Sequence, residues 1–368
     1  MGDATLTGRQ VFLPEINTNG SVLIPRRATD LDCYASSKFQ QDFGSCEIGQ
    51  KNEAIAITVN GELQRFDPNT SIPLHVVRPY VRSGFDVTVF LTLQSRRPKL
   101  IAQEWHSARF RTMPQYNDDE EIQLLEGVAK ALIDSGAKCV KIHLYNLIRR
   151  PPQMPSWLSG ANPGKASVNR FQLVWPSYVL HLLVHSMVWR DVIRAEHLTS
   201  SKFDFIFKMR ADSGWLGDTA VVYRDIEADA VAVKACLEWE GVNDKLALIP
   251  RRYANKWMDL LSAYYDDSLF GYKNSEQYQQ KIAHLYHIPI RRYKNMFPMI
   301  DYYWWLRDLQ GNLGCFPWNY AGVAGGHRCA CVDHVLCTEL TRRMCAGKRP
   351  LGPGINYNNN IKKVERRK

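Results

Sequence analysis

The chain has 368 residues, of which 45% are hydrophobic and 11% aromatic, so it can bury the core of one large domain or of two lobes and is not a disordered chain. Its 47 lysines and arginines exceed its 37 acidic residues, and the formal charge of +10 favours an anionic partner such as a nucleotide, a polyanion or an acidic membrane face. Basic residues are scattered and no nucleic-acid-binding module is recognisable, so we expect no nucleic-acid partner.

Neither a signal peptide nor a transmembrane segment is visible in the sequence. The first residues lack the basic start and the apolar run of a signal peptide. The longest apolar helical stretch, Tyr178 to Trp189, is too short to span a bilayer. The nine cysteines are an odd number, and we expect them to be reduced, buried residues of a cytosolic protein. These features predict a soluble, cytoplasmic protein, and they leave its oligomeric state open.

Strands and helices are predicted to alternate after an irregular start. Residues 1–51 are expected to be irregular, because Pro, Asn, Gly and Ser interrupt every short apolar run. Beyond them, apolar runs predict strands and helical spacing predicts helices. The predicted strands are Ala54–Val59, Asp86–Leu93, Cys139–Leu144 and Phe203–Met209, and the predicted helices between them are Ile72–Arg82, Asp119–Ser135 and Asn169–His197.

The pattern becomes more elaborate in the second half of the chain. Alternating strands and helices with short connections indicate an α/β fold with a mostly parallel central sheet and helices on both faces. No internal repeat or clean linker is visible, so we expect a single domain over residues 52–350 and a basic tail over residues 351–368. The elements predicted for this half are strands at Ala220–Tyr223, Val231–Leu237 and Ile288–Tyr293 and helices at Arg251–Tyr265 and Ser275–His287.

The stretch from Phe203 to Asp218 places charge at the end of a strand. Its aromatic and β-branched start is typical of a central strand, which runs directly into Arg210 and Asp212. In open α/β sheets, ligands bind at the carboxyl ends of the strands. A carboxylate at that position suits a hard divalent cation, and the cation suits a phosphate. The alternative is that Asp212 caps the next turn and Arg210 is a solvated flank.

Four motifs occur in an order that resembles a known enzyme family. Over roughly Ala54 to Tyr293 the chain resembles the nucleotide-sugar glycosyltransferases of the GT-A type, as found in microbial, viral and plant glycosyltransferase-like sequences. The resemblance implies a GT-A-like fold and the transfer of a sugar from a nucleotide-sugar donor to a hydroxyl of a glycan acceptor. The motifs are Val59-Asn-Gly-Glu-Leu-Gln-Arg65, Arg210-Ala-Asp212, Gly241-Val-Asn-Asp244 with Lys245-Leu-Ala-Leu-Ile249, and Asn274-Ser-Glu276.

The resemblance also implies roles for single residues. It assigns contacts with the donor to Asn60, Gly61, Arg65 and Arg210, and binding of Mn²⁺ or Mg²⁺ to Asp212. The chain departs from the family at two of these positions. The family usually places the arginine close behind the glycine, whereas Glu62, Leu63 and Gln64 separate Gly61 from Arg65. The family's metal motif is commonly D-x-D, and here only its second acid, Asp212, is present.

Sugar transfer needs cations for the leaving diphosphate and a base for the attacking hydroxyl. Asp244 is the candidate base, because it follows a glycine and an asparagine that let the backbone come close to a ligand. The alternative is that Asp244 caps a helix beginning at Lys245. Glu276 is the next candidate base, and its alternative is likewise a helix cap.

Three further observations leave alternatives open. His181 and His185 are one helical turn apart, which is a spacing of zinc ligands, but the leucines between them indicate a packed face. The segment from His327 to Cys345 is rich in cysteine, and metal binding, disulfides and plain packing all remain open for it. A non-catalytic basic protein of the same fold that recognises glycan or nucleic acid is the alternative function, and the presence of both Asp212 and Asp244 favours the enzyme.

Overall fold

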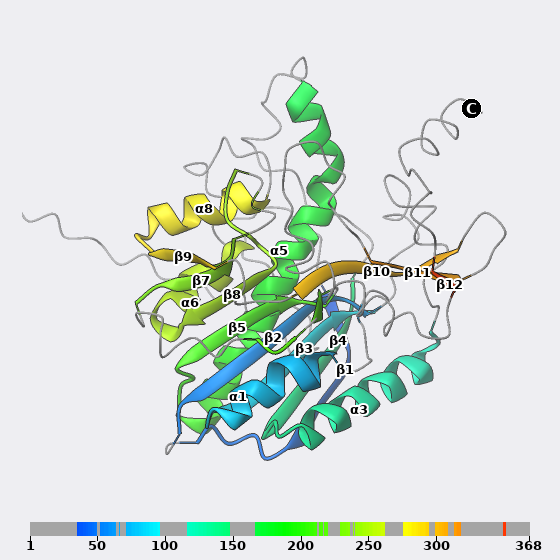
Figure 1. The fold of residues 1–368 in the computed structure, drawn as a ribbon, viewed down its shortest axis with the longest axis vertical. Helices are drawn as coiled ribbons and strands as arrows, with labels where there is room; N and C mark the ends of the chain where they lie inside the picture. Colours follow the sequence, from blue (N-terminus) through cyan, green and yellow to red (C-terminus); the bar gives the residue numbers. More distant parts are fainter. Residues whose placement is uncertain are drawn as a thin grey trace, which may run out of the picture.

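A central sheet of eight strands organises the part of the chain that the structure describes (Figure 1). The computed structural model describes residues 35–49, 52–63, 66, 71–95, 116–147, 166–211, 213–215, 217–219, 229–235, 238, 240–261, 275–293, 299–307, 313–317 and 349–350. The strands of this sheet are β1 (Ala35–Gly44), β2 (Ala54–Glu62), β3 (Asp86–Gln94), β4 (Cys139–Leu147), β5 (Phe205–Arg210), β7 (Val231–Lys234), β8 (Leu246–Pro250) and β9 (Ile290–Tyr293).

The sheet is mostly parallel, as the sequence predicts. Its strand order is β1-β4-β3-β2-β5-β8-β7-β9. The four neighbours β4, β3, β2 and β5 pair in parallel, and so do β7 and β9. The edge strand β1 and the inner strand β8 run antiparallel to their neighbours. Strands β2 and β3 are apolar along most of their length because the inner strands of a parallel sheet are covered on both faces.

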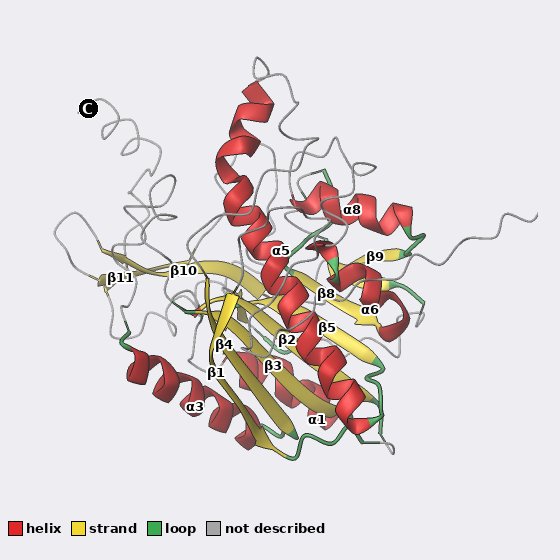
Figure 2. Ribbon diagram, turned by 180° about the vertical axis from the view of Figure 1, so that it is seen from behind, coloured by secondary structure: helices red, strands yellow, loops and turns green. Residues whose placement is uncertain are grey.

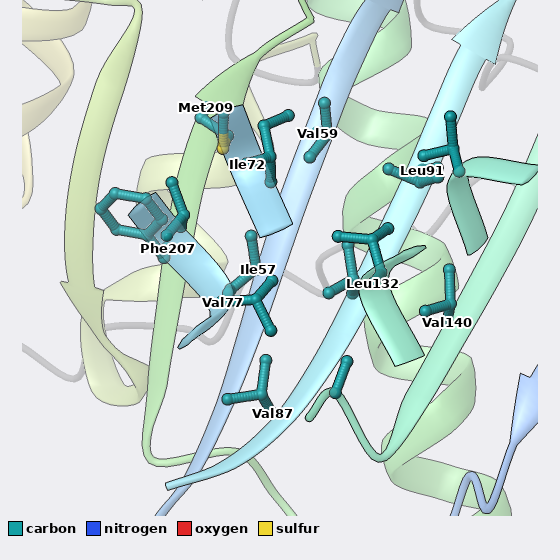
Figure 3. Packing of buried hydrophobic residues seen from close by; sticks show 14 of the residues in the cluster. Ile57, Val59, Ile72, Val77, Val87, Leu91, Leu132, Val140, Phe207 and Met209 are labelled. Carbon is teal, nitrogen blue, oxygen red and sulfur yellow. The ribbon is translucent and has the colours of Figure 1, made fainter. Parts of the chain in front are cut away.

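Helices cover both faces of this sheet. Residues of η2, α1 and α3 pack on one face in a cluster with β2 to β5 (Figure 3). The long helix α5 crosses the other face (Figure 2), where it forms a second cluster with residues of α6 and α8. The helices of the described residues are η2 (Pro73–Val77), α1 (Arg78–Arg82), α3 (Asp118–Asp134), α5 (Ala166–Thr199), α6 (Arg251–Met258) and α8 (Ser275–Leu285).

Local sequence signals explain where α3 begins. The side chain of Asn117 accepts a hydrogen bond from the backbone N–H of Glu120 at 2.9 Å, and the Glu120 carboxylate accepts one from the backbone N–H of Asn117 at 2.7 Å. This capping box satisfies two of the N–H groups that every helix start leaves unpaired. Four acidic residues in the first turn complement the helix dipole. In the described part of the chain, no helix is both long and apolar enough to cross a bilayer.

The structure confirms the expected α/β class and the mostly parallel sheet. It also confirms the predicted elements that fall on the described residues, with boundaries shifted by a few residues. The expectation of an irregular segment over residues 1–51 is wrong for Ala35–Gly44, which form β1, and residues 1–34 lie outside the described part of the chain. Only two large apolar side chains, Phe39 and Phe43, occur in this strand, so its sequence carries little strand signal. It forms because β4 offers an edge along which it pairs antiparallel. The predicted strand Ala220–Tyr223 and the predicted tail 351–368 lie outside the described residues.

A second, smaller sheet and a disulfide were not predicted. The strands of the smaller sheet lie in the order β12-β11-β10-β6, with β6 at Ser213–Trp215, β10 at Met299–Arg307, β11 at Leu313–Pro317 and β12 at Arg349–Pro350. Cys46 and Cys139 form a disulfide, which corrects the expectation of reduced cysteines for these two. The pairing of Gly44 with Cys139 in the β1–β4 ladder brings the two cysteines together across a separation of 93 residues.

The order of the strands creates a switch point between β2 and β5. From β2 the chain steps outward to β3 and β4, and α5 then returns it to β5 on the other side of β2. Connections therefore leave the carboxyl ends of β2 and β5 in opposite directions, and ligands of α/β proteins commonly bind at such a switch point. Gly61 lies at this point with a φ of 152°, and a Cβ on it would lie 2.9 Å from the Cβ of Ala211.

We predict that Gly61→Ala destabilises the protein, whereas Gly127→Ala does not. The first substitution combines an unfavourable φ with the close contact to Ala211, and we expect a loss of about 1–3 kcal/mol in the free energy of unfolding. Gly127 is exposed within α3 with no atom within 4 Å of an added Cβ, so alanine should add up to about 1 kcal/mol. Urea denaturation of both variants measures the difference, and equal stabilities would contradict this account.

Candidate active site

Three strand ends meet at the edge of the sheet that contains the switch point. Asn60, near the end of β2, is the cross-strand neighbour of Arg210 at the end of β5. Strand β8 runs antiparallel to β5 and pairs Leu246 with Met209, so Asp244 lies just ahead of β8 at the same edge. The structure therefore brings together four of the predicted site residues, Asn60, Gly61, Arg210 and Asp244. Arg65 and Asp212 lie outside the described residues.

Lys208 ties the loop ahead of β8 to β5. Side chains alternate along a strand, and Phe207 and Met209 belong to the cluster under α1 and α3, so Lys208 faces the side of α5. Its Nζ donates a hydrogen bond to the backbone oxygen of Asp244 at 2.6 Å, within the protein interior. Burial lowers the pKa of Lys208 to about 8, although the carboxylate of Asp244 works in the opposite direction.

Asp244 is a buried carboxylate in a cationic environment. It is 6% exposed, its Oδ1 has no hydrogen-bond partner among the described residues, and its Oδ2 lies 4.0 Å from Nε2 of His181. Burial opposes its charge, but nearby cationic groups outweigh burial and hold the pKa of its carboxyl below its ordinary value. The carboxylate is therefore ionised at neutral pH. The groups responsible are Arg210, His181, Lys245 and Lys208.

The alternative that Asp244 caps a helix is wrong. Lys245 leads directly into strand β8 and not into a helix. The local side-chain hydrogen bond in this turn belongs to Asn243, whose Oδ1 accepts from the backbone N–H of Lys245 at 2.9 Å. The carboxylate of Asp244 is therefore not used as a helix cap.

Glu276 is a second buried carboxyl, at the start of α8. The backbone N–H of Val242 donates to the backbone oxygen of Glu276 at 3.0 Å, and Gly241 packs so closely that a Cβ on it would lie 2.1 Å from the Glu276 carbonyl carbon. Glu276 is 7% exposed and accepts a hydrogen bond from Ser275 Oγ at 3.0 Å. Burial, and then the charge of Asp244, raise the pKa of Glu276 to about 7. The sequence pointed to this residue only as the next candidate.

His181 and His185 form a contact pair on α5 beside Asp244. Their Nε2 atoms lie 3.0 Å apart, so one ring donates and the other accepts. His185 is fully buried, and burial, followed by the charges of Lys208, His181 and Arg210, holds its pKa well below the ordinary value. His185 is therefore neutral, and a packed face is confirmed for it. Among the described residues, no group of three His, Cys, Asp or Glu side chains is placed to hold a metal ion.

A polar row continues from Asn60 across the sheet under α5. Asn60 is fully buried, and neither polar atom of its amide has a hydrogen-bond partner in the described part of the chain. Its neighbour on β3 is Thr92, and the next along is His143 on β4. Both contact Asp191 of α5 at 3.0 Å. This row was not predicted from the sequence, where its signal is one polar residue in each of several otherwise apolar strands.

A cavity of about 490 Å³ lies away from these residues, at the end of α5. It reaches Arg251, which follows the last residue of β8 and so lies at the opposite edge of the sheet from Asp244. Arg251 is held there by both oxygens of Glu196, at 2.7 and 2.6 Å. The cavity therefore takes no part in the candidate active site.

Comparisons with known proteins leave the family of the chain open. No protein-family model matches the sequence, and no curated protein matches it. Among solved structures, the apo form of mouse xyloside xylosyltransferase 1 is 8% identical at a TM-score of 0.30, over 66% of this chain and 85% of that one. The glycosyltransferase GlyE of Streptococcus pneumoniae TIGR4 is 11% identical at a TM-score of 0.29, over 66% of this chain and 45% of its own length. Likenesses this weak do not establish a function.

The raised pKa of Glu276 predicts a stability that falls as the pH rises. The pKa is about 7 in the folded protein against an ordinary 4.5, so the contribution of Glu276 is fully present below pH 4.5 and is lost as the pH rises through 7. The loss is on the order of 3 kcal/mol. We expect the free energy of unfolding in urea to fall between pH 5 and pH 8, and Glu276→Gln, which stays neutral, to lack this part of the fall. Identical pH dependence in the two proteins would contradict the assignment.

Proposed function

We propose that the protein is a glycosyltransferase that moves a sugar from a nucleotide-sugar donor to a hydroxyl of a glycan acceptor. The observation that carries the proposal is the ionised, buried carboxylate of Asp244 among cationic groups at the switch-point edge of the sheet. The ordered motifs that resemble GT-A glycosyltransferases support the same function. Two of them, the ends of β2 and β5, meet Asp244 at this edge.

Asp244 is proposed as the base. In the reaction, the acceptor oxygen forms a bond to the anomeric carbon of the donor sugar, and the bond from that carbon to the diphosphate breaks with its electron pair. The proton of the hydroxyl goes to the carboxylate of Asp244. Its Oδ1 has no hydrogen-bond partner among the described residues, so a lone pair is available for that proton.

Arg210 is proposed to stabilise the leaving diphosphate. It is partly exposed at the carboxyl end of β5, where a ligand at the switch point would lie. A fixed cation at that position stabilises negative charge as it develops on the leaving group. Lys208 has a different role, because it is buried and donates to the backbone oxygen of Asp244. It holds the base in place.

Asp212 is the residue that we propose as a ligand of Mn²⁺ or Mg²⁺. The described donors at this edge are Asp244, Glu276 and His181, and they do not form a group that could hold a metal. Lys208 and Lys245 lie within electrostatic reach of Asp244 and would oppose a divalent cation there. The described residues by themselves do not fit a metal site, and no step of the proposed reaction depends on one.

We predict that Asp244→Asn slows sugar transfer by at least ~100-fold while the protein stays folded. Asparagine keeps the shape of the side chain, and the hydrogen bond from Lys208 survives because it ends on the backbone oxygen. Donor affinity should not fall, since a general base acts in the transition state and the lost charge no longer repels an anionic donor. Transfer rates, melting temperature and donor affinity of the variant are the measurements.

Asp86→Asn is the matched control for this prediction. Asp86 is also a buried carboxylate with a lysine partner, Lys138, but it lies at the start of β3, at the opposite edge of the sheet. Its neutralisation should affect stability and leave the transfer rate close to that of the parent. If Asp244→Asn transfers sugar at the parental rate, Asp244 is not the base. A parent that binds glycan without any transfer would favour the non-catalytic alternative.

A separate prediction tests the metal. If Asp212 binds a divalent cation that contacts the diphosphate, Asp212→Asn should weaken Mn²⁺-dependent donor binding and leave folding intact. Thermal shifts with nucleotide sugars, with and without Mn²⁺, measure this, because a ligand that binds only the folded state raises the melting temperature. An Asp212→Asn protein with an unchanged Mn²⁺-dependent shift would remove Asp212 from the proposal.

A further inference from the structure

We propose that the site takes its anionic nucleotide with Glu276 protonated, which leaves Asp244 as the one carboxylate charge of this pair. The proposal rests on the proposed function, since it concerns the same site and donor. It begins from the contact between two segments. The loop with Asp244 and the first turn of α8 are held together by the hydrogen bond from Val242 to Glu276 and by the close approach of Gly241.

More cationic groups act on the carboxyl of Asp244 than on that of Glu276. The charges that act on Glu276 from the packed segments are those of Asp244 and Lys245 in the loop, and Lys208 of β5 lies within reach of both carboxyls. Arg210 and His181 act on Asp244 in addition. On α8 itself, the hydroxyl of Ser275 donates to Glu276. Asp244 therefore keeps the negative charge more easily than Glu276 does.

A nucleoside diphosphate would increase this inequality. Its phosphates bring further negative charge to a site where two carboxylates already repel each other. Because Glu276 is 7% exposed, water solvates an ionised carboxylate there only weakly. Binding therefore favours protonation of Glu276, and the proton comes from the solvent. When Glu276 is ionised before binding, each binding event takes up one proton.

This linkage makes nucleotide affinity depend on pH. Free Glu276 is mostly protonated at pH 6 and mostly ionised at pH 8, because its pKa is about 7. The number of protons taken up on binding should therefore rise from well below one at pH 6 toward one at pH 8. Above pH 8, the affinity should fall up to about tenfold for each pH unit.

The test is calorimetry with UDP and GDP at pH 6, 7 and 8, in pairs of buffers that differ in ionisation enthalpy. The difference in heat between two buffers gives the number of protons taken up. Glu276→Gln keeps the shape of the side chain and stays neutral, so its affinity should fall less steeply above pH 7 than that of the parent. Lys208, whose pKa is about 8, loses its charge in both proteins and accounts for the fall that remains. The nucleotide's own phosphate ionisation contributes in both proteins and cancels when the variant is subtracted from the parent.

Glu240→Gln is the matched control, because it removes one negative charge from an exposed glutamate near the same loop. Glu240 contacts Gln277 at the surface, and its neutral variant should retain the proton uptake of the parent. Equal uptake in the parent and in Glu276→Gln would overturn the proposal. The proposal would also be overturned if the parent protein bound nucleotide without a rise in proton uptake between pH 6 and pH 8. This second result does not depend on whether a variant folds.

The outcomes separate this proposal from the proposed function. If neither nucleotide binds at any pH, both proposals fall together. Normal binding without Glu276-dependent uptake removes only the role of Glu276. Uptake as described, together with an Asp244→Asn protein that transfers at the parental rate, keeps the role of Glu276 in nucleotide binding and removes Asp244 as the base.

Discussion

The hydrogen bond from the Lys208 ammonium to the backbone oxygen of Asp244 connects the sheet to the candidate active site. The backbone of Lys208 is held on both sides because β5 lies inside the sheet, between β2 and β8. Its bond fixes the loop whose Gly241 in turn packs against the start of α8. The position of Glu276 follows from that contact. The bond from Lys208 and the contacts of Val242 and Gly241 with Glu276 thus bring two carboxyl groups from distant parts of the chain to one edge of the sheet.

Charge balance around these carboxyl groups decides their ionisation. Both are buried, and burial by itself would raise the pKa of each carboxyl group. The additional cations near Asp244 outweigh burial there, whereas burial and the charge of Asp244 prevail at Glu276. Two carboxyls of similar chemistry thereby acquire opposite tendencies, as pairs of groups in catalytic sites commonly do. The difference between the two pKa values arises from where the neighbouring charges lie, which the residue types alone do not reveal.

The two faces of the sheet have different roles. The face under α1 and α3 is a continuous apolar cluster, which includes Ile57, Val59, Leu91 and Phe207 (Figure 3). The face under α5 is apolar near the amino ends of the strands and becomes polar toward their carboxyl ends, where Asn60 and Lys208 lie. Alternation along each strand lets the same strands build both faces. The first face stabilises the sheet, and the second positions polar groups at the switch point.

The sequence by itself determined the α/β class, most elements of the central sheet, and Arg210 and Asp244 as site candidates, because apolar runs and motif order are local signals. It missed β1, since pairing with β4 forms that strand and its own residues signal it weakly. It also missed the link from Lys208 to Asp244, because a lysine within an apolar strand carries no sign of its partner 36 residues away. Only the tertiary structure decided that Asp244 precedes a strand and that Glu276 lies beside it. Pairing and burial join segments far apart in the chain, and no local pattern encodes which ones meet.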